Sequence, residues 1–245
     1  MPVRIGIIAI GGKGSRLGQS YIQKCLVPIE GKPLVEYTID AFVDNGIKLI
    51  IFLTGFLHEQ VSSYLIQRYG TNAKFVPATV FGGTTGLGPA LSTLRHFINE
   101  DFIFAHGDFI LKHRVFSNFI QEGERLSDSV AVMLVTKDTS IAPTPSFVRV
   151  ESDNITVRTI RLPTPRRRPG LSDLVDIGLC YFRPEVFQFL SMVKPDKHLA
   201  SFIRPARRAG YKISAITTAE PCFFLHTQED IEKWETAKTS LFPLT

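Results

Sequence analysis

The feature that most constrains the fold is a regular alternation of short apolar runs with segments whose apolar side chains recur at helical spacing. The apolar runs are typical of buried strands and lie at residues 3–10, 47–54, 73–77, 102–105 and 129–136. The segments of helical spacing lie at residues 34–45, 58–69, 89–98 and 116–123. Because strands that alternate with helices form βα units, this half of the chain predicts a mostly parallel sheet covered by helices.

The pattern changes after residue 136. Turn-flanked runs with strand-like alternation predict strands at residues 147–151, 155–161 and 176–182. Two helices, a strand and a last helix are expected at residues 184–192, 199–209, 212–216 and 228–238. A chain of 245 residues with no long linker is the size of one domain. We therefore expect a single α/β domain over residues 1–245, with a small antiparallel insertion in its second half.

Composition excludes several classes of protein. A hydrophobic fraction of 44% and 19 phenylalanines are too high for a disordered chain, and no apolar run is long enough for a membrane span. The three cysteines, Cys25, Cys180 and Cys222, form no CxxC pair, so neither a disulfide framework nor a thiolate zinc site is indicated. The N-terminal segment lacks the pattern of a signal peptide. These features favour a folded cytoplasmic protein without membrane association.

The net charge of +5 is concentrated in one stretch. Residues 149–168 contain six arginines against Glu151 and Asp153, and these are Arg149, Arg158, Arg161, Arg166, Arg167 and Arg168. A nucleic-acid-binding surface usually spreads its basic residues over a helix or sheet face with aromatic residues between them. The clustered charge therefore favours small anions over nucleic acid. The run Arg166–Arg168 is read either as a solvated loop or as a basic lid over an anionic pocket.

A glycine-rich loop, GGKGSRL at residues 11–17, follows the first predicted strand directly. Glycines at such a place let backbone N–H groups approach phosphate, although a plain tight turn is an equally good explanation of the glycines alone. The loop matches neither a Walker A sequence nor GxGxxG. It offers Arg16, and Lys24 follows eight residues later. A guanidinium and an ammonium group that converge on a glycine-rich loop favour binding of a triphosphate.

Two spaced motifs, GGKGSRL and KCLVPIEGKPLVEYTI at residues 24–39, together resemble the signature of the sugar-phosphate nucleotidyltransferases, the nucleoside-diphosphate-sugar pyrophosphorylases. Looser similarity continues through GLGPAL at 86–91, FAHGD at 104–108 and DIGLCYF at 176–182. The resemblance implies a three-layer αβα Rossmann-like core, similar to the GT-A fold, with a mostly parallel mixed sheet. It also implies a nucleotide-binding half, residues 1–136, and a sugar-phosphate-binding half, residues 137–245.

The resemblance implies that an NMP group passes from an NTP to a sugar 1-phosphate, giving an NDP-sugar and pyrophosphate with the help of Mg²⁺. Charge neutralisation and alignment are the main tasks of such a site. Arg16 would grip the triphosphate, Lys24 would bridge the two reacting phosphates, and Asp108 would hold Mg²⁺; as plain alternatives, Lys24 is a solvated loop lysine and Asp108 a turn residue. The implied nucleotide-binding residues are Gly11, Gly12, Gly14, Ser15 and Gly86. The implied residues for the sugar phosphate are Arg161, Asp176 and Gly178.

Some positions depart from the family pattern. Phe224 stands where the family has a second metal-binding acid, so that either Asp108 works with substrate oxygens alone, or His226 or Glu220 substitutes, or activity is lost. Gln23 replaces a proline before the lysine, and Arg161-Leu162-Pro163 replaces a Glu-Lys-Pro sequence. Two alternatives therefore stay open: transfer to a non-sugar phosphomonoester such as phosphocholine or a polyol phosphate, and a catalytically silent regulatory homologue that binds nucleotide sugar. The NTP and the sugar are not indicated, and a homo-oligomer is compatible with the sequence.

Overall fold

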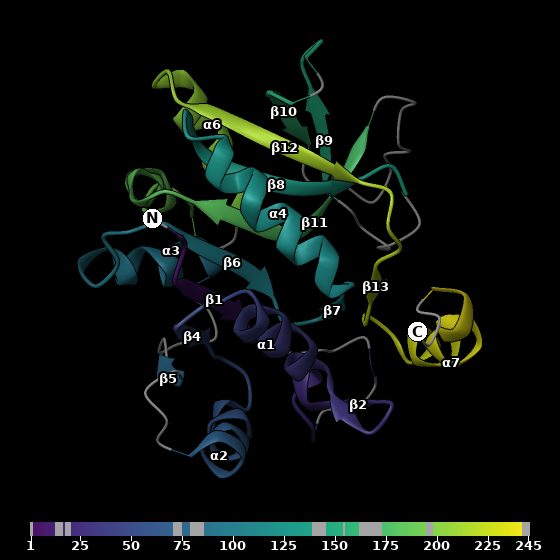
Figure 1. The fold of residues 1–245 in the computed structure, drawn as a ribbon. Coiled ribbons are helices and arrows are strands. Elements are labelled where there is room, and N and C mark those ends of the chain that lie inside the picture. Colours follow the sequence, from purple (N-terminus) through teal and green to yellow (C-terminus); the bar gives the residue numbers. More distant parts are fainter. Residues whose placement is uncertain are drawn as a thin grey trace.

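The computed structural model describes residues 2–12, 17, 21–70, 75–78, 86–138, 146–153, 155–161, 173–194 and 198–241. Within these residues, the centre is a sheet whose main path runs β10-β9-β11-β6-β1-β4-β5 (Figure 1). The strands of this path are β1 (Ile5–Ala9), β4 (Leu49–Leu53), β5 (Phe75–Ala78), β6 (Phe102–His106), β9 (Phe147–Val150), β10 (Val157–Arg161) and β11 (Leu174–Phe182). Strand β8 (Ser129–Thr136) also pairs with β11, and β12 (Lys212–Thr218) pairs with β8.

Strand directions follow the change of pattern in the sequence. Strands β1, β4, β5 and β6 are parallel, whereas β11 runs antiparallel to β6, β8 and β9. The register places Ala9 beside both Leu53 and His106, so the chain leaves β1, β4 and β6 at one common edge. This carboxyl edge is where open α/β sheets bind ligands.

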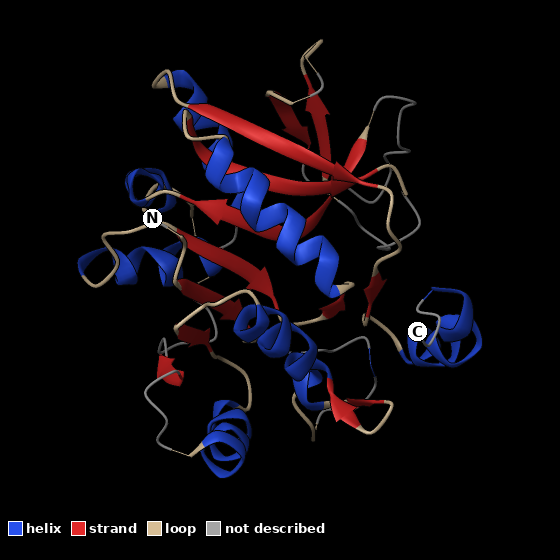
Figure 2. Cartoon of the chain, viewed as in Figure 1, coloured by secondary structure: helices blue, strands red, loops and turns tan. Residues whose placement is uncertain are grey.

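Helices cover both faces of the sheet (Figure 2). One face packs on α1 (Leu34–Asp44), α2 (His58–Tyr69) and α4 (His113–Arg125). The other face packs on α3 (Leu87–Ser92), α5 (Phe187–Leu190) and α6 (Ile203–Arg208), with the 3₁₀ turns Thr93–His96, Pro184–Val186 and Leu199–Phe202 beside them. Each face buries its own apolar cluster, because the fully buried strands carry apolar side chains on both sides. The predicted three-layer Rossmann-like architecture is confirmed.

A third, smaller cluster joins segments far apart in the sequence. The hairpin of β2 (Pro28–Ile29) and β3 (Lys32–Pro33) packs near β13 (Phe223–Phe224), which pairs with β7 (Phe109–Ile110). The last helix, α7 (Gln228–Leu241), closes this cluster with Trp234, whose side chain is 4% exposed and lies 4.9 Å from the ring of Phe223. Trp234 is thus a core residue.

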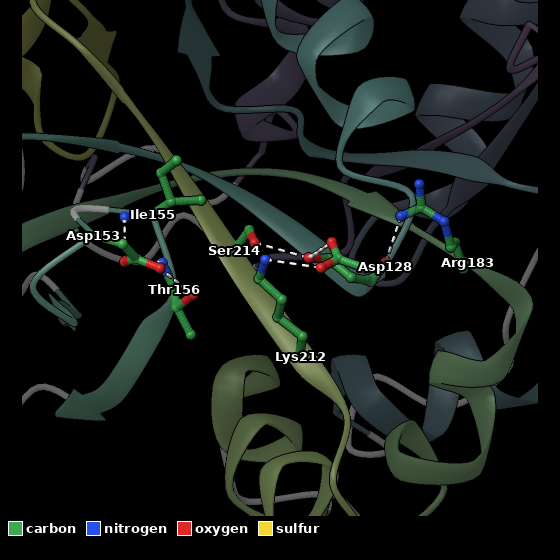
Figure 3. A network of polar contacts seen from close by, with 8 residues as sticks. Asp128, Asp153, Ile155, Thr156, Arg183, Lys212 and Ser214 are labelled. Carbon is green, nitrogen blue, oxygen red and sulfur yellow. Dashed lines mark hydrogen bonds and ion pairs between the residues drawn. The ribbon is translucent and has the colours of Figure 1, made fainter.

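Polar contacts stabilise the part of the sheet formed by β8, β11 and β12, away from the carboxyl edge (Figure 3). Lys212 Nζ lies 2.9 Å from Asp128 Oδ2, and Arg183 donates to the carbonyl of Ser129. The turn at Asp153 docks on β12, because Ala215 N donates to the carbonyl of Ile155 at 2.8 Å. The contacts of Lys212 and Arg183 fix β8, β11 and β12 at the end remote from the carboxyl edge, whereas the bond of Ala215 lies in the middle of β12. No helix in the described portion is long and apolar enough to cross a membrane.

Candidate active site

Lys24 and Asp108 meet at the carboxyl edge although 84 residues separate them. Lys24 Nζ lies 2.6 Å from Asp108 Oδ2, and the two side chains are 13% and 27% exposed. Burial alone would raise the pKa of Asp108, but the Lys24 ammonium group and the nearby His106 outweigh burial and lower this pKa. Asp108 is therefore a carboxylate at neutral pH, and it is held beside a cation.

Backbone contacts fix Asp108 from two sides. Gly107 N donates to the carbonyl of Ala9 at 3.0 Å, and a Cβ at Gly107 would collide with Ile10. On the other side, Leu225 N donates to the carbonyl of Asp108 at 2.9 Å, next to the pairing of β13 with β7. The acid thus depends both on β1 and on a strand late in the chain.

The glycine-rich loop begins against the end of β4. Phe56 N donates to the carbonyl of Gly11 at 3.2 Å, and a Cβ on Gly55 would lie 2.8 Å from that oxygen. Only a residue without a side chain permits this approach. Gly12 follows with open space around it. The predicted residues Gly14, Ser15 and Arg16 lie outside the described residues, as does Arg166–Arg168.

Gln23 connects the glycine-rich loop with the lysine. Its side chain, in a residue that is 1% exposed, donates through Nε2 to the carbonyls of Ile10 and Gly12, the latter at 3.3 Å. Its Oε1 accepts from Cys25 N at 2.6 Å. Sequence reasoning noted Gln23 only as a departure from proline. The amide in fact ties the start of the loop to the 3₁₀ turn Lys24–Leu26 that carries Lys24.

Asp176 and Gly178 lie on β11, the neighbour of β6. Leu179 pairs with Ala105 near the carboxyl end of β6, and Asp176 lies three residues before Leu179 on the antiparallel β11, towards the carboxyl edge. Gly178 has a φ of +85° and donates its N–H to Asp176 Oδ1 at 2.9 Å, and a Cβ there would collide with the ring of His106. His106 packs on Phe104, with 5.2 Å between the two ring centroids. Burial raises the pKa of Asp176.

Two residues that sequence reasoning missed complete this side of the edge. Ser146 accepts from Asp176 N at 3.0 Å through its carbonyl, and its Oγ lies 3.3 Å from His198 Nε2. His198 Nδ1 in turn accepts from Ala200 N at 3.3 Å. Burial lowers the pKa of His198, and Asp176 opposes this shift only in part. Neither residue belongs to a sequence motif, so only their tertiary contacts identify them.

The remaining predicted residues are less central. Gly86 caps α3 with a φ of +70°, and its carbonyl accepts from Ala90 N at 3.2 Å. Arg161 ends β10 and pairs with Phe147, but its side chain lies outside the description. Arg149, counted with the basic stretch, is bound by Asp173 at 2.6 Å. Part of the positive charge at residues 149–168 is therefore neutralised within the fold.

The second acid of the family pattern has no equivalent at Phe224. The Phe224 ring stacks on His226, with 5.7 Å between ring centroids and 15° between planes, and it also contacts Phe109. Glu220 is bound by Lys112 at 3.1 Å and by Arg114, so its charge is already balanced. His226 is close enough to Asp108 to help lower its pKa. Among the described residues, no group of three or more metal-ligating side chains gathers.

Four of the polar groups described above form a row along the carboxyl edge of the sheet. In the sheet order β1, β6, β11, β9, the adjacent strands present the Gly11–Gly12 loop, Asp108, Asp176 and Ser146 in turn. Lys24 reaches into the row at Asp108. A cation next to backbone N–H groups suits phosphate, and a carboxylate with hydroxyl and imidazole groups beside it suits a polar second substrate.

Comparison with known proteins agrees with this geometry. Residues 6–209 match the MobA-like NTP transferase domain. A UTP–glucose-1-phosphate uridylyltransferase, AglF of Haloferax volcanii, is 27% identical over 212 residues, which cover 85% of this chain and 79% of that protein. The bifunctional protein GlmU of Methanococcus maripaludis is 26% identical over 193 residues, or 78% of this chain, and the match spans 43% of GlmU.

Similarity to solved structures supports the fold. A UDP-glucose pyrophosphorylase in complex with UDP-glucose superimposes with a TM-score of 0.82 at 18% identity, over 97% of this chain and 99% of that chain. AglF is a uridylyltransferase by name and this structural neighbour a pyrophosphorylase, and the match to the family domain covers most of the sequence. The resemblance inferred from the motifs is thereby confirmed, and the chain belongs to the MobA-like NTP transferase family.

Proposed function

We propose that the protein transfers a nucleoside monophosphate group from an NTP to a sugar 1-phosphate. An oxygen of the acceptor phosphate forms a bond to the α-phosphorus, and the bond from that phosphorus to the oxygen bridging to the β-phosphate breaks. The electron pair of the broken bond leaves with pyrophosphate. No general base is needed, because the attacking phosphate is already ionised near neutral pH.

The row at the carboxyl edge carries this proposal. In it, the half at residues 1–136 binds the NTP through the Gly11–Gly12 loop, with Gly14, Ser15, Arg16 and Gly86 as further contacts. Lys24 neutralises charge between the two reacting phosphates, and Gln23 holds it in register with the loop. Preorganised charge of this kind is the main source of rate acceleration in phosphoryl transfer.

Asp108 fits a Mg²⁺ ion as a single protein ligand. Mg²⁺ commonly takes one or two carboxylates and completes its shell with phosphate oxygens and water. Asp108 is ionised and lies at the edge where the triphosphate would bind, whereas Glu220 is committed to Lys112 and Arg114. The bound ion would screen the negative charge of the triphosphate, and Lys24 would move from Asp108 towards the phosphates.

The half at residues 137–245 supplies the acceptor side. Asp176 and Gly178 lie on β11, which pairs with β6, the strand before Asp108. Arg161 is a candidate for the acceptor phosphate, because an arginine near the missing lysine of the family pattern could supply its charge. The relatives AglF and UDP-glucose pyrophosphorylase are named for a sugar 1-phosphate or an NDP-sugar, which favours that acceptor class here. A non-sugar phosphomonoester is the alternative acceptor.

One observation favours a second candidate function. Phe224 fills the position of the second metal-binding acid with an aromatic ring that stacks on His226, and a silent regulatory homologue that binds nucleotide sugar would tolerate this. The retained pair of Lys24 and Asp108 at 2.6 Å favours catalysis, because a silent homologue has no need of it.

The test is a screen for pyrophosphate release. The common NTPs are combined with sugar 1-phosphates, inositol phosphate and phosphocholine in the presence of Mg²⁺. Release with at least one pair, lost in Lys24→Ala and in Asp108→Ala while both variants keep their folded CD spectrum, supports the transferase. Tight binding of a nucleotide sugar by calorimetry without any release refutes it in favour of the regulatory homologue.

A further inference from the structure

At the acceptor end of the row, Ser146 contacts Asp176 through its backbone and His198 through its side chain. The Ser146 backbone holds Asp176, because its carbonyl accepts from Asp176 N at 3.0 Å. The Ser146 hydroxyl contacts His198, with Oγ 3.3 Å from Nε2. The whole Ser146 residue is buried, and β9, which it precedes, pairs with β11 at Leu174 and Val175. Ser146, Asp176 and His198 therefore form one wall, which we call the acceptor wall.

The hydrogen-bond pattern assigns the protons of this wall. His198 Nδ1 accepts from Ala200 N, so the ring nitrogen without a proton is Nδ1 and the proton lies on Nε2. Nε2 then donates to Ser146 Oγ. A hydroxyl whose oxygen accepts from a fixed donor turns its own proton elsewhere, so Ser146 is left to donate. The burial that lowers the pKa of His198 keeps the ring in this neutral form.

Asp176, in contrast to Ser146, can accept a hydrogen bond from a ligand. Its Oδ1 accepts from Gly178 N at 2.9 Å, which sets the orientation of the carboxyl group. A carboxyl group keeps lone-pair positions beyond the one that Gly178 N occupies, so it can still accept from a ligand. The wall thus offers a hydroxyl donor and a carboxyl acceptor on two residues that a backbone hydrogen bond joins, and its imidazole adds no charge.

We propose that the acceptor wall binds a hydroxyl group of the second substrate. This hydroxyl group donates to Asp176 and accepts from the hydroxyl of Ser146, and His198 is a positioning residue that orients Ser146. This inference rests on the proposed function and narrows the class of acceptor substrate. The second substrate is a phosphomonoester rich in hydroxyl groups, such as a sugar or polyol phosphate. A phosphocholine acceptor has no hydroxyl group to satisfy the Ser146 donor, and a buried donor left unpaired costs binding energy.

The experiment measures steady-state kinetics for the best NTP and acceptor pair of the screen. Ser146→Ala removes the donor, and His198→Asn keeps an acceptor for Ala200 N but no longer reaches Ser146. We expect each variant to raise the KM for the acceptor about tenfold, the effect of one lost hydrogen bond, while the KM for the NTP changes less than twofold. His198→Gln, whose amide N–H group reaches as far as Nε2, should restore most of the acceptor KM.

Ser201→Ala is the matched control, because Ser201 lies beside His198 and its Oγ has no hydrogen-bond partner among the residues that the structure describes. It should leave both KM values unchanged. Thermal melts separate a loss of folding from a loss of recognition. An acceptor KM that is unaltered in Ser146→Ala and His198→Asn, or a preference for phosphocholine over hydroxylated acceptors, overturns the inference while the transferase function stands.

An inactive wild type refutes the proposed function instead. In that case, calorimetric binding of sugar 1-phosphate and of an NDP-sugar still tests the wall. Affinity that falls about tenfold in Ser146→Ala but not in Ser201→Ala supports it, and equal affinity in all three proteins overturns it.

Discussion

Replacing Gln23 by methionine should destabilise the protein far more than a surface change of similar chemistry. Methionine matches the shape of glutamine, so the substitution removes hydrogen bonds and leaves no cavity. The carbonyls of Ile10 and Gly12 and the N–H of Cys25 then lose their partner in a site where Gln23 is 1% exposed. Each buried polar group left unpaired costs about 1–3 kcal/mol.

Because the three groups share one partner and relax together, we expect a total loss of about 3 kcal/mol in the free energy of unfolding. For a chain of this size, 1 kcal/mol shifts Tm by about 2–4 °C, so the expected fall in Tm is about 6–12 °C. The KM for the NTP should rise as well, because the glycine-rich loop loses its tie to Lys24. Calorimetric melting and NTP kinetics measure the two effects.

Gln60→Met provides the control. Gln60 accepts from Gln23 N at 3.0 Å and donates to the carbonyl of Tyr21 at 2.7 Å, but it is only half-buried and its bond to Tyr21 is exposed. It should cost about 1 kcal/mol or less. If Gln23→Met lowers Tm no more than Gln60→Met does, the buried amide does not hold the loop, and the reasoning fails.

Three further predictions follow from contacts at and near the site. Gly178→Ala should cost at least about 2 kcal/mol in urea unfolding, because the φ of +85° strains alanine and its Cβ meets His106; a cost below about 0.5 kcal/mol would contradict this. A double-mutant cycle of Lys24→Met and Asp108→Asn should give a coupling free energy of about 1–3 kcal/mol, a range that already allows for the partial exposure of both side chains. Additive effects of the two substitutions would show that the ion pair at 2.6 Å is not formed in solution. Hydrogen bonds from the side chain and backbone of Thr156 and from Ile155 N lower the pKa of Asp153 to about 2. The contribution of Asp153 to stability is therefore complete above about pH 4 and is lost as the pH falls towards 2. A carboxyl titration by NMR checks this pKa, and a midpoint near 4 would refute it.

The sequence predicts the parallel half of the fold well, because its strands are buried on both faces and its helices are amphipathic. The helix expected at residues 58–69 and the strand expected at 129–136 match α2 and β8. The helix expected at 116–123 is longer, since α4 spans His113–Arg125. The two-residue strands β7 and β13 were not predicted, because a pair of residues is too short to show a period.

The site was predictable only where motifs mark it. Lys24 and Asp108 each lie in a recognisable motif, and the structure brings them together. Ser146 and His198 carry no such mark, because their roles depend on the pairing of β9 with β11 and on a backbone N–H group from another segment. Gln23 stood out as an odd residue in a motif, but its role depends on carbonyls of the loop before it.

The bond from Leu225 N to the carbonyl of Asp108 has a consequence for folding order. The first half of the chain contains the glycine-rich loop, the lysine and the acid, yet the acid gains its second backbone anchor only when β13 docks on β7. Contacts between residues so distant in sequence form late and slowly. In refolding, nucleotide affinity should therefore appear after most of the helical signal. The interval between the two signals would measure how late the C-terminal segment docks.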